Sequence, residues 1–228
     1  MENEKYIVVM FCNNQDLVQP WFYFAKMAMR KSKQFPILSH DNGSNDETWD
    51  ELRKLNADYS CGFLENKGIA AGRNHIINVA KIPYPSGFKN IILVDSDLFI
   101  IRHNSFLAME NTMKDTGAGV VFGKQMSFDP AREGFEWKQD GYSFCLISGE
   151  TFDKYGLFDE QFENYYDDTD FHMRLKANNV KMAVCEQALG VHMWGMTTTL
   201  GSEGYRRGQL LESDKRKFKN KWENQNGL

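Results

Sequence analysis

The sequence predicts an α/β fold in which a mostly parallel central sheet is covered by helices on both faces. Three short apolar runs, at residues 6–11, 36–39 and 91–94, indicate buried strands. Helical patterns alternate with these runs, which is the order that places helices on both faces of a parallel sheet. With 228 residues and 42% hydrophobic residues the chain can bury a sizeable core, so we expect a single domain over residues 1–228.

Composition excludes several classes of protein. The formal net charge of -4 argues against a whole-protein electrostatic grip on nucleic acid, although a local basic patch remains open. The four cysteines are far apart and form no C-x-x-C pair, so the sequence predicts neither a zinc site nor a disulfide framework. No basic leader and no apolar run of about 18–20 residues is present, so we expect a soluble, cytoplasmic protein, with peripheral attachment to a membrane face left open.

The segment after the second strand has the spacing of a helix start. Ser44 and Glu47 stand in the S-x-x-E arrangement of a capping box, and apolar residues then repeat at helical intervals. A strand over residues 59–64 and a helix around residues 76–80 follow. The sequence therefore predicts a helix that begins at Ser44.

Two carboxylates follow directly after the apolar run at residues 90–94. Asp95 and Asp97, with Ser96 between them, come at the carboxyl end of a predicted parallel strand, where open α/β sheets bind ligands. Two carboxylates at such an edge can hold a hard divalent cation, which neutralises a diphosphate. A lone D-x-D occurs by chance in many chains, so the strand context carries this hypothesis.

His192 is a candidate third ligand for that cation. It follows an apolar run around residues 182–184, and an imidazole nitrogen beside two carboxylates would favour Mn²⁺ over Mg²⁺. The alternative is a hydrogen-bonded core histidine, which is the more common role of a single histidine in an apolar run.

A second acidic cluster opens a predicted helix. Asp167, Asp168 and Asp170 precede the apolar positions Phe171 and Leu175. Carboxylates at a helix N-terminus stabilise the helix dipole, which is the simpler explanation. The alternative is a general base, which must lie within hydrogen-bond reach of an acceptor hydroxyl.

Two further segments permit only broad predictions. Residues 126–142 are polar and interrupted by Pro and Gly, so we expect an acceptor loop rather than a regular element, with Trp137 either stacking on a ligand or anchoring the loop. Residues 201–228 are basic with acids interleaved, which indicates a solvated helix face. A lid over the donor diphosphate, formed by Arg206 or Arg207, or a patch for an anionic acceptor remain alternatives.

Several blocks, in order along the chain, resemble glycosyltransferase family 2. Residues 41–48, DNGSNDET, resemble its D-[DN]-G-S-x-D-x-T signature, and residues 68–74 resemble its G-x-x-x-x-R-N segment. Residues 95–97 resemble its D-x-D, and residues 156–160 followed by 167–170 resemble G-x-F-D-E and E-D-x-D, with Asp167 in place of the usual glutamate. His192 stands where the family often has a metal-binding histidine, and residues 218–222 resemble the F-x-x-K-W ending of some members.

The resemblance implies a GT-A (Rossmann-like) fold and an inverting transfer of a sugar from a nucleotide diphosphate sugar to an acceptor hydroxyl. Its nucleotide-sugar-binding half would span about residues 1–100 and its acceptor-binding half about residues 101–200. By the resemblance, Asp41 would bind the nucleotide base and Arg73 the nucleotide or its diphosphate. The segment Asp95–Asp97 would bind the ribose and the metal, with His192 as a metal ligand. Asp168 would be the general base, with Asp167 and Asp170 as the other candidates. The donor favoured by family habit is a UDP-sugar, with Mn²⁺ or Mg²⁺, and the acceptor is open among a glycan, a lipid-linked glycan, a protein and modified DNA.

Three other functions are alternatives to an inverting glycosyltransferase. A sugar nucleotidyltransferase needs a glycine-rich, basic phosphate loop after its first strand, where this chain has residues 12–15, CNNQ. A non-catalytic sugar-nucleotide or glycan-binding domain should have lost one of the acidic sites, and both are present. A retaining GT-A transferase differs only in the anomeric configuration of its product.

Overall fold

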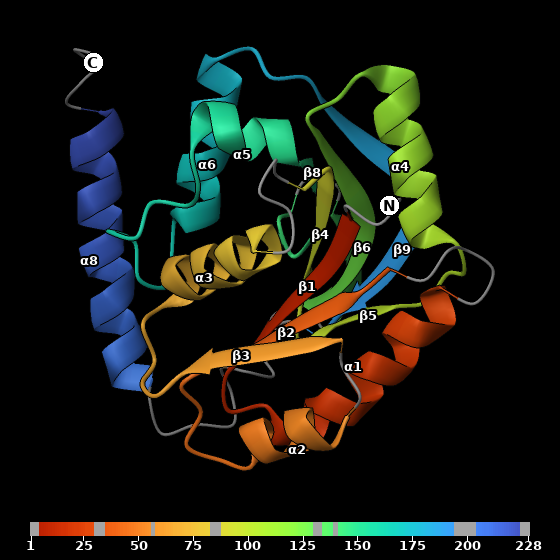
Figure 1. Ribbon diagram of the computed structural model, residues 1–228. Coiled ribbons are helices and arrows are strands. Elements are labelled where there is room, and N and C mark those ends of the chain that lie inside the picture. The colour runs from red at the N-terminus through yellow and green to blue at the C-terminus, as the bar shows by residue number, and fades with distance from the viewer. Residues whose placement is uncertain are drawn as a thin grey trace.

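The computed structural model describes residues 5–29, 35–55, 58–82, 88–129, 134–138, 141–193 and 204–223 (Figure 1). Its strands are β1 (Lys5–Phe11), β2 (Ile37–Asn42), β3 (Tyr59–Phe63), β4 (Asn90–Asp95), β5 (Leu98–Ile100), β6 (Val120–Asp129), β7 (Gly134–Lys138), β8 (Phe144–Ser148) and β9 (Met182–His192). Its helices are α1 (Gln15–Ala28), α2 (Thr48–Lys54), α3 (Ile69–Lys81), α4 (Ser105–Thr116), α5 (Gly149–Tyr155), α6 (Asp167–Ala177) and α8 (Gly204–Trp222).

Within these residues, nine strands form one sheet in the order β3-β2-β1-β4-β8-β6-β9-β5, and β7 pairs with β6. The pairs β3/β2, β2/β1 and β1/β4 are parallel, as is β6/β9. Strand β8 runs antiparallel to both β4 and β6, and β5 runs antiparallel to β9. The predicted α/β class is confirmed, and its parallel strands bring the carboxyl ends of β1, β2 and β4 to one edge.

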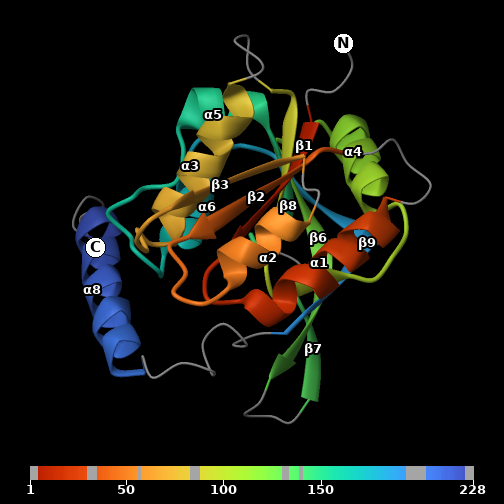
Figure 2. The same cartoon turned by 60° about the horizontal axis from the view of Figure 1, so that its bottom comes forward.

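Alternate residues of the central strands pack into two apolar clusters, one on each face of the sheet. Ile7, Val9 and Phe11 pack with side chains from α1, α2 and α4, whereas Val8 packs with side chains from α3, α5 and α6. This is the period of two expected of a strand buried on both faces. Figures 1 and 2 show the two groups of helices on opposite sides of the sheet. Among the described helices, none combines the length and the apolar composition needed to cross a membrane.

The expected loop over residues 126–142 is wrong where the structure describes that segment. Strands β6 and β7 form an antiparallel hairpin, with Met126 opposite Trp137, and β7 extends beyond the rest of the sheet (Figure 2). The polar composition is that of an edge strand rather than of a loop. Trp137 is 51% exposed, and the ammonium of Lys124 lies 5.2 Å from its ring centroid.

The capping box predicted at Ser44 is also wrong. Helix α2 begins at Thr48, whose backbone N–H donates to the side chain of Asp46, while the Ser44 hydroxyl donates to Asp41. The chain turns through Gly43 at a positive φ of 72°, and a Cβ there would overlap the backbone of Glu65. The segment after β2 is therefore a turn built around Asp41, and the helix starts four residues later than predicted.

Helix α8 has the exposed face that its composition predicts, but its other face is docked on the rest of the protein. The side chain of Asp214 is fully buried, and its Oδ2 accepts the backbone N–H groups of Glu163, Asn164 and Tyr165 at 3.1, 3.0 and 3.2 Å. Its Oδ1 accepts from the Lys217 ammonium at 2.9 Å. One carboxylate of α8 thus holds the backbone of the loop that leads into α6.

The segment that resembles the F-x-x-K-W ending makes further contacts with the same region. The Lys221 ammonium lies 2.7 Å from Asp170 and 2.6 Å from Asp159, and the Trp222 indole N–H donates to Asp170 at 2.9 Å. The Phe218 ring packs against that of Tyr166 with centroids 4.9 Å apart. In Figure 1, α8 lies on the outer side of α3 and α6. The described part of residues 201–228 is thus a helix docked on the loop before α6 and on the first turn of α6.

The Asp214 contacts give a direct test of this docking. In Asp214→Ala, three backbone donors lose their acceptor, and Lys217 keeps its hydrogen bond to the Gln161 carbonyl oxygen. We expect the free energy of unfolding to fall by about 1–3 kcal/mol. Equilibrium denaturation in urea measures the change. The matched control is Glu212→Ala on the exposed face of the same helix, which should change stability by less than about 0.5 kcal/mol. Equal effects of the two substitutions would contradict the docking role.

Candidate active site

The D-x-D residues lie in the turn between β4 and β5. Asp95 is the last residue of β4 and pairs in register with Met10 of β1. Its carbonyl oxygen accepts the Trp21 indole N–H at 3.1 Å, and the carbonyl oxygen of Asp97 accepts the backbone N–H of Met193 at 2.8 Å. A side-chain hydrogen bond from α1 and a backbone hydrogen bond from the residue after β9 therefore fix this turn on both sides.

Asp95, Asp97 and His192 form the candidate metal group. One donor atom from each lies within 4.8 Å of the other two, and Nε2 of His192 is 3.1 Å from Oδ1 of Asp97. His192 ends β9 opposite Leu98 of β5. This antiparallel pairing brings it beside Asp97, which is 95 positions earlier in the chain. Two carboxylates and one imidazole with converging donor atoms form a set that fits Mn²⁺ or Mg²⁺.

Arg73, from α3, joins this group to the acidic cluster of α6. Its Nη2 donates to Asp95 at 3.2 Å and its Nη1 to Asp167 at 2.8 Å, and its Cζ lies 5.3 Å from the centroid of the Phe158 ring. Burial alone would lower the pKa of Arg73, but Asp167, Asp95 and Asp168 raise it above its ordinary value. The guanidinium is thus a fixed positive charge between the two acidic groups that the sequence singles out.

The three acids of α6 have different surroundings. Asp167 is buried, which raises its pKa, and Arg73 opposes that increase. Asp168 is half-buried, and its Oδ1 accepts from the backbone N–H of Thr169 at 2.6 Å. Asp170 is fully buried and accepts from Arg174, Lys221 and Trp222. Asp168 is the acid of this cluster with both solvent access and proximity to Arg73, whereas Asp170 ties α6 to α8.

Asp41 lies at the same edge of the sheet, at the end of β2. It pairs in register with Phe11 of β1, next to the Met10 position that pairs with Asp95. Its Oδ1 accepts both the backbone N–H and the hydroxyl of Ser44. Burial raises the pKa of Asp41, and the Ser44 hydrogen bonds oppose that increase. Because β1 separates β2 from β4, Asp41 lies in a separate part of the edge from the metal group.

Sequence reasoning missed the residues that support these groups. Asn74 donates to the Phe158 carbonyl oxygen and accepts from the Phe158 N–H, at 2.8 and 3.0 Å, so the segments 68–74 and 156–160 bind one another. Ser96, a predicted donor-binding residue, donates its hydroxyl to the buried Asn14 at 3.1 Å. Asn74 is the last residue of the segment that resembles G-x-x-x-x-R-N, so the motif could have indicated it. Asn14 carried none, because its partner is 82 residues away.

The Arg73 contacts predict a large stability effect. Arg73→Met leaves Asp167 buried without its partner, and we expect a loss of about 3–5 kcal/mol in the free energy of unfolding. Adding Asp167→Asn to that variant should recover part of the loss, since it removes the unpaired charge. Urea denaturation of the single and double variants measures both effects. Arg53→Met, at an exposed position of α2, is the control, and additive effects of Arg73→Met and Asp167→Asn would refute the coupling.

Several solved structures share this fold. The mannosyltransferase PcManGT from Pyrobaculum calidifontis, in complex with GDP-Man and Mn²⁺, superposes with a TM-score of 0.67 at 13% identity, over 94% of this chain and 63% of that one. TarS from S. aureus gives 0.66 at 14% identity, over 83% of this chain and 36% of that one. TarS residues 1–349 in complex with UDP give 0.66 at 15% identity, over 83% and 60%. The chain therefore spans less than two thirds of the length of each of these structures.

At these identities the likeness shows the fold alone, and the predicted GT-A fold is confirmed. A search of curated proteins by sequence finds no match. The family is shown by a separate comparison, in which the model of glycosyl transferase family 2 matches residues 6–189. Since that match covers most of the sequence and includes the strand ends, Arg73 and the acidic cluster of α6, this chain belongs to glycosyl transferase family 2.

Proposed function

We propose that this protein transfers a sugar from a nucleotide diphosphate sugar to an acceptor hydroxyl, with inversion at the anomeric carbon and with the help of a divalent metal. One observation carries the proposal. Arg73 contacts both Asp95 of the metal group and Asp167, the neighbour of Asp168. A donor diphosphate and a general base would thereby meet at one place.

The donor binds along the carboxyl edge of the parallel strands in this proposal. Asp41, which is buried at the end of β2, contacts the nucleotide base, and the segment Asp95–Asp97 contacts the ribose. Arg73 makes two of the five N–H donations available to a guanidinium, which leaves donors for a phosphate. The solved relatives hold GDP-Man in one case and UDP in another, and we propose a UDP-sugar here.

Asp95, Asp97 and His192 would hold the cation, for which the mixed oxygen and nitrogen set favours Mn²⁺, with Mg²⁺ as the alternative. When bound, the metal neutralises charge on the departing diphosphate. The solved mannosyltransferase contains Mn²⁺, which supports the choice.

The general base in this proposal is Asp168. Among the three acids, Asp170 is enclosed by cationic and indole partners and Asp167 is paired with Arg73, whereas Asp168 is half-buried at the start of α6. Its carboxylate takes the proton of the acceptor hydroxyl as that oxygen attacks C1. The nucleoside diphosphate leaves from the opposite face of the sugar, so no bond forms between sugar and protein.

The halves of the chain divide these tasks in the proposal. Residues 1–100 bind the nucleotide sugar and residues 101–200 bind the acceptor, with the exposed ring of Trp137 as a stacking surface. Residues 201–228 include α8, which supports the α6 cluster. The acceptor is a glycan, a lipid-linked glycan, a protein or modified DNA.

The base assignment has a kinetic test. With a panel of nucleotide sugars scored for nucleoside diphosphate release, Asp168→Asn should lower kcat by about 10²- to 10⁴-fold and leave donor affinity within a few fold, because the amide cannot accept a proton. The control is Asp115→Asn, at an exposed position of α4. Full activity of Asp168→Asn would reject the role. NMR of the product decides inversion, since a retained anomeric configuration would support a retaining transferase instead.

Metal removal tests the second part of the proposal. Activity should be lost after dialysis against a chelator and regained on addition of Mn²⁺, because the diphosphate then has its counter-charge. In Asp97→Ala, Mn²⁺ should restore less than about a hundredth of the wild-type rate, which corresponds to about 2.7 kcal/mol of transition-state stabilisation. Activity that is unchanged by the chelator, or restored fully in Asp97→Ala, would contradict metal assistance.

A further inference from the structure

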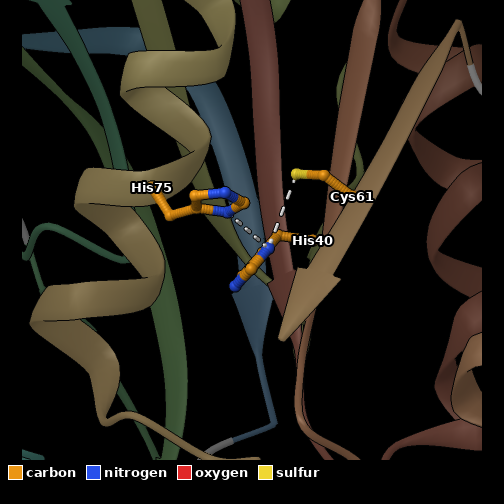
Figure 3. A group of neighbouring side chains, drawn as sticks. All are labelled: His40, Cys61 and His75. Atoms are coloured by element: carbon orange, nitrogen blue, oxygen red, sulfur yellow. Dashed lines mark hydrogen bonds between the residues drawn. The ribbon is translucent and has the colours of Figure 1, made fainter. Parts of the chain in front are cut away.

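Three potential metal ligands converge on the other side of β2 from Asp41. They are His40 on β2, Cys61 on β3 and His75 on α3, and one donor atom of each lies within 4.8 Å of the other two. His40 and Cys61 are register partners in the parallel pair β2/β3, and α3 covers this face of the sheet. Figure 3 shows the three side chains pointing toward one another.

The distances fit a coordination sphere. Nδ1 of His40 lies 3.4 Å from Nδ1 of His75 and 3.5 Å from Sγ of Cys61. In a tetrahedral zinc site with bonds of about 2.0 Å to nitrogen and about 2.3 Å to sulfur, two nitrogens lie about 3.3 Å apart and nitrogen and sulfur about 3.5 Å apart. Both distances from His40 thus match those between zinc ligands, and the third pair, Cys61 and His75, lies within 4.8 Å.

The hydrogen-bonding capacity of His40 supports a cation at this point. A neutral imidazole has a single lone pair on one nitrogen, and two neighbours compete for Nδ1 of His40. Its other nitrogen, Nε2, and Oδ1 of Asn42 are both buried atoms outside hydrogen-bonding geometry. A metal on Nδ1 would fix the proton on Nε2, and Asn42, whose side chain interacts with His40, would then accept it, as outer partners of metal-bound histidines do.

His75 is the member of the group that borders a pocket. It lines a cavity of about 390 Å³ together with Phe63, Lys67, Ala71, Asn78 and Glu160. Three protein ligands leave one position of a tetrahedral zinc site open, which a water molecule would fill.

From this geometry we propose that His40, Cys61 and His75 bind one Zn²⁺, separate from the cation of the Asp95, Asp97 and His192 group. The two donor sets differ in chemistry, since thiolate and imidazole suit Zn²⁺ whereas carboxylates suit Mn²⁺ or Mg²⁺. The bound zinc would connect β2, β3 and α3, which carry Asp41 and Arg73. It would stabilise the position of these three elements relative to one another, and with them Asp41 and Arg73.

Cobalt titration tests the site, with Co²⁺ as a spectroscopic substitute for Zn²⁺. The full chain, freed of metal and carrying Asp97→Ala to remove the acidic site, should give a thiolate-to-cobalt charge-transfer band that saturates at one ion per chain and disappears when Zn²⁺ is added. Cys61→Ser should abolish the band, and His75→Gln should weaken Co²⁺ binding by at least about 100-fold, since loss of an outer partner alone costs about 10- to 100-fold. Cys12→Ser and His103→Gln are the matched controls.

The outcomes are distinct from those of the transfer assay. No band in the parent chain, a band that persists in Cys61→Ser, or unchanged affinity in His75→Gln would overturn the zinc proposal. Near-ultraviolet circular dichroism of the metal-free variants checks that each is folded. If Cys61→Ser does not fold, the affinity of His75→Gln, a partly exposed position, decides.

Discussion

The buried guanidinium of Arg73 is the contact on which the geometry of the candidate site depends. It lies between Asp95, at the end of β4, and Asp167, at the start of α6. Since α6 is a helix, no strand pairing of the sheet joins these two elements. Removing charges from water is costly, and the cost is offset only when each charge keeps its partners. The arrangement therefore tolerates little displacement of either element, and it sets where the acidic turn of α6 lies relative to the metal group.

The edge of the sheet is the part of the site that sequence reasoning could predict. Asp41 and Asp95 each follow a buried apolar run, and parallel strands bring their carboxyl ends to one edge whatever the details of packing. Asp170 and Asp214 show the limit. Both read as solvated acids in their own helices, and both are fully buried because each meets a partner about 50 residues away. A local pattern carries no information on such pairs.

The capping-box prediction failed because the polar atom it needs is bound by another group. Ser44 has the spacing of a helix cap, but its hydroxyl is bound to Asp41, and Asp46 takes the Thr48 N–H instead. The cysteine-spacing rule covers only ligands close in sequence, so it does not bear on the proposed zinc group. His40, Cys61 and His75 come together through strand register and helix packing, for which residue spacing has no signature.

The docking of α8 also affects the order in which parts of the protein fold during synthesis. Asp159 leaves the ribosome 62 residues before Lys221, and Asp170 leaves it 52 residues before Trp222, which bind them. Domains generally fold as units during synthesis, but the turn that carries Asp168 lacks its support until α8 has emerged. A nascent chain would therefore form the edge of its parallel strands before the acidic turn of α6 gains the support of α8.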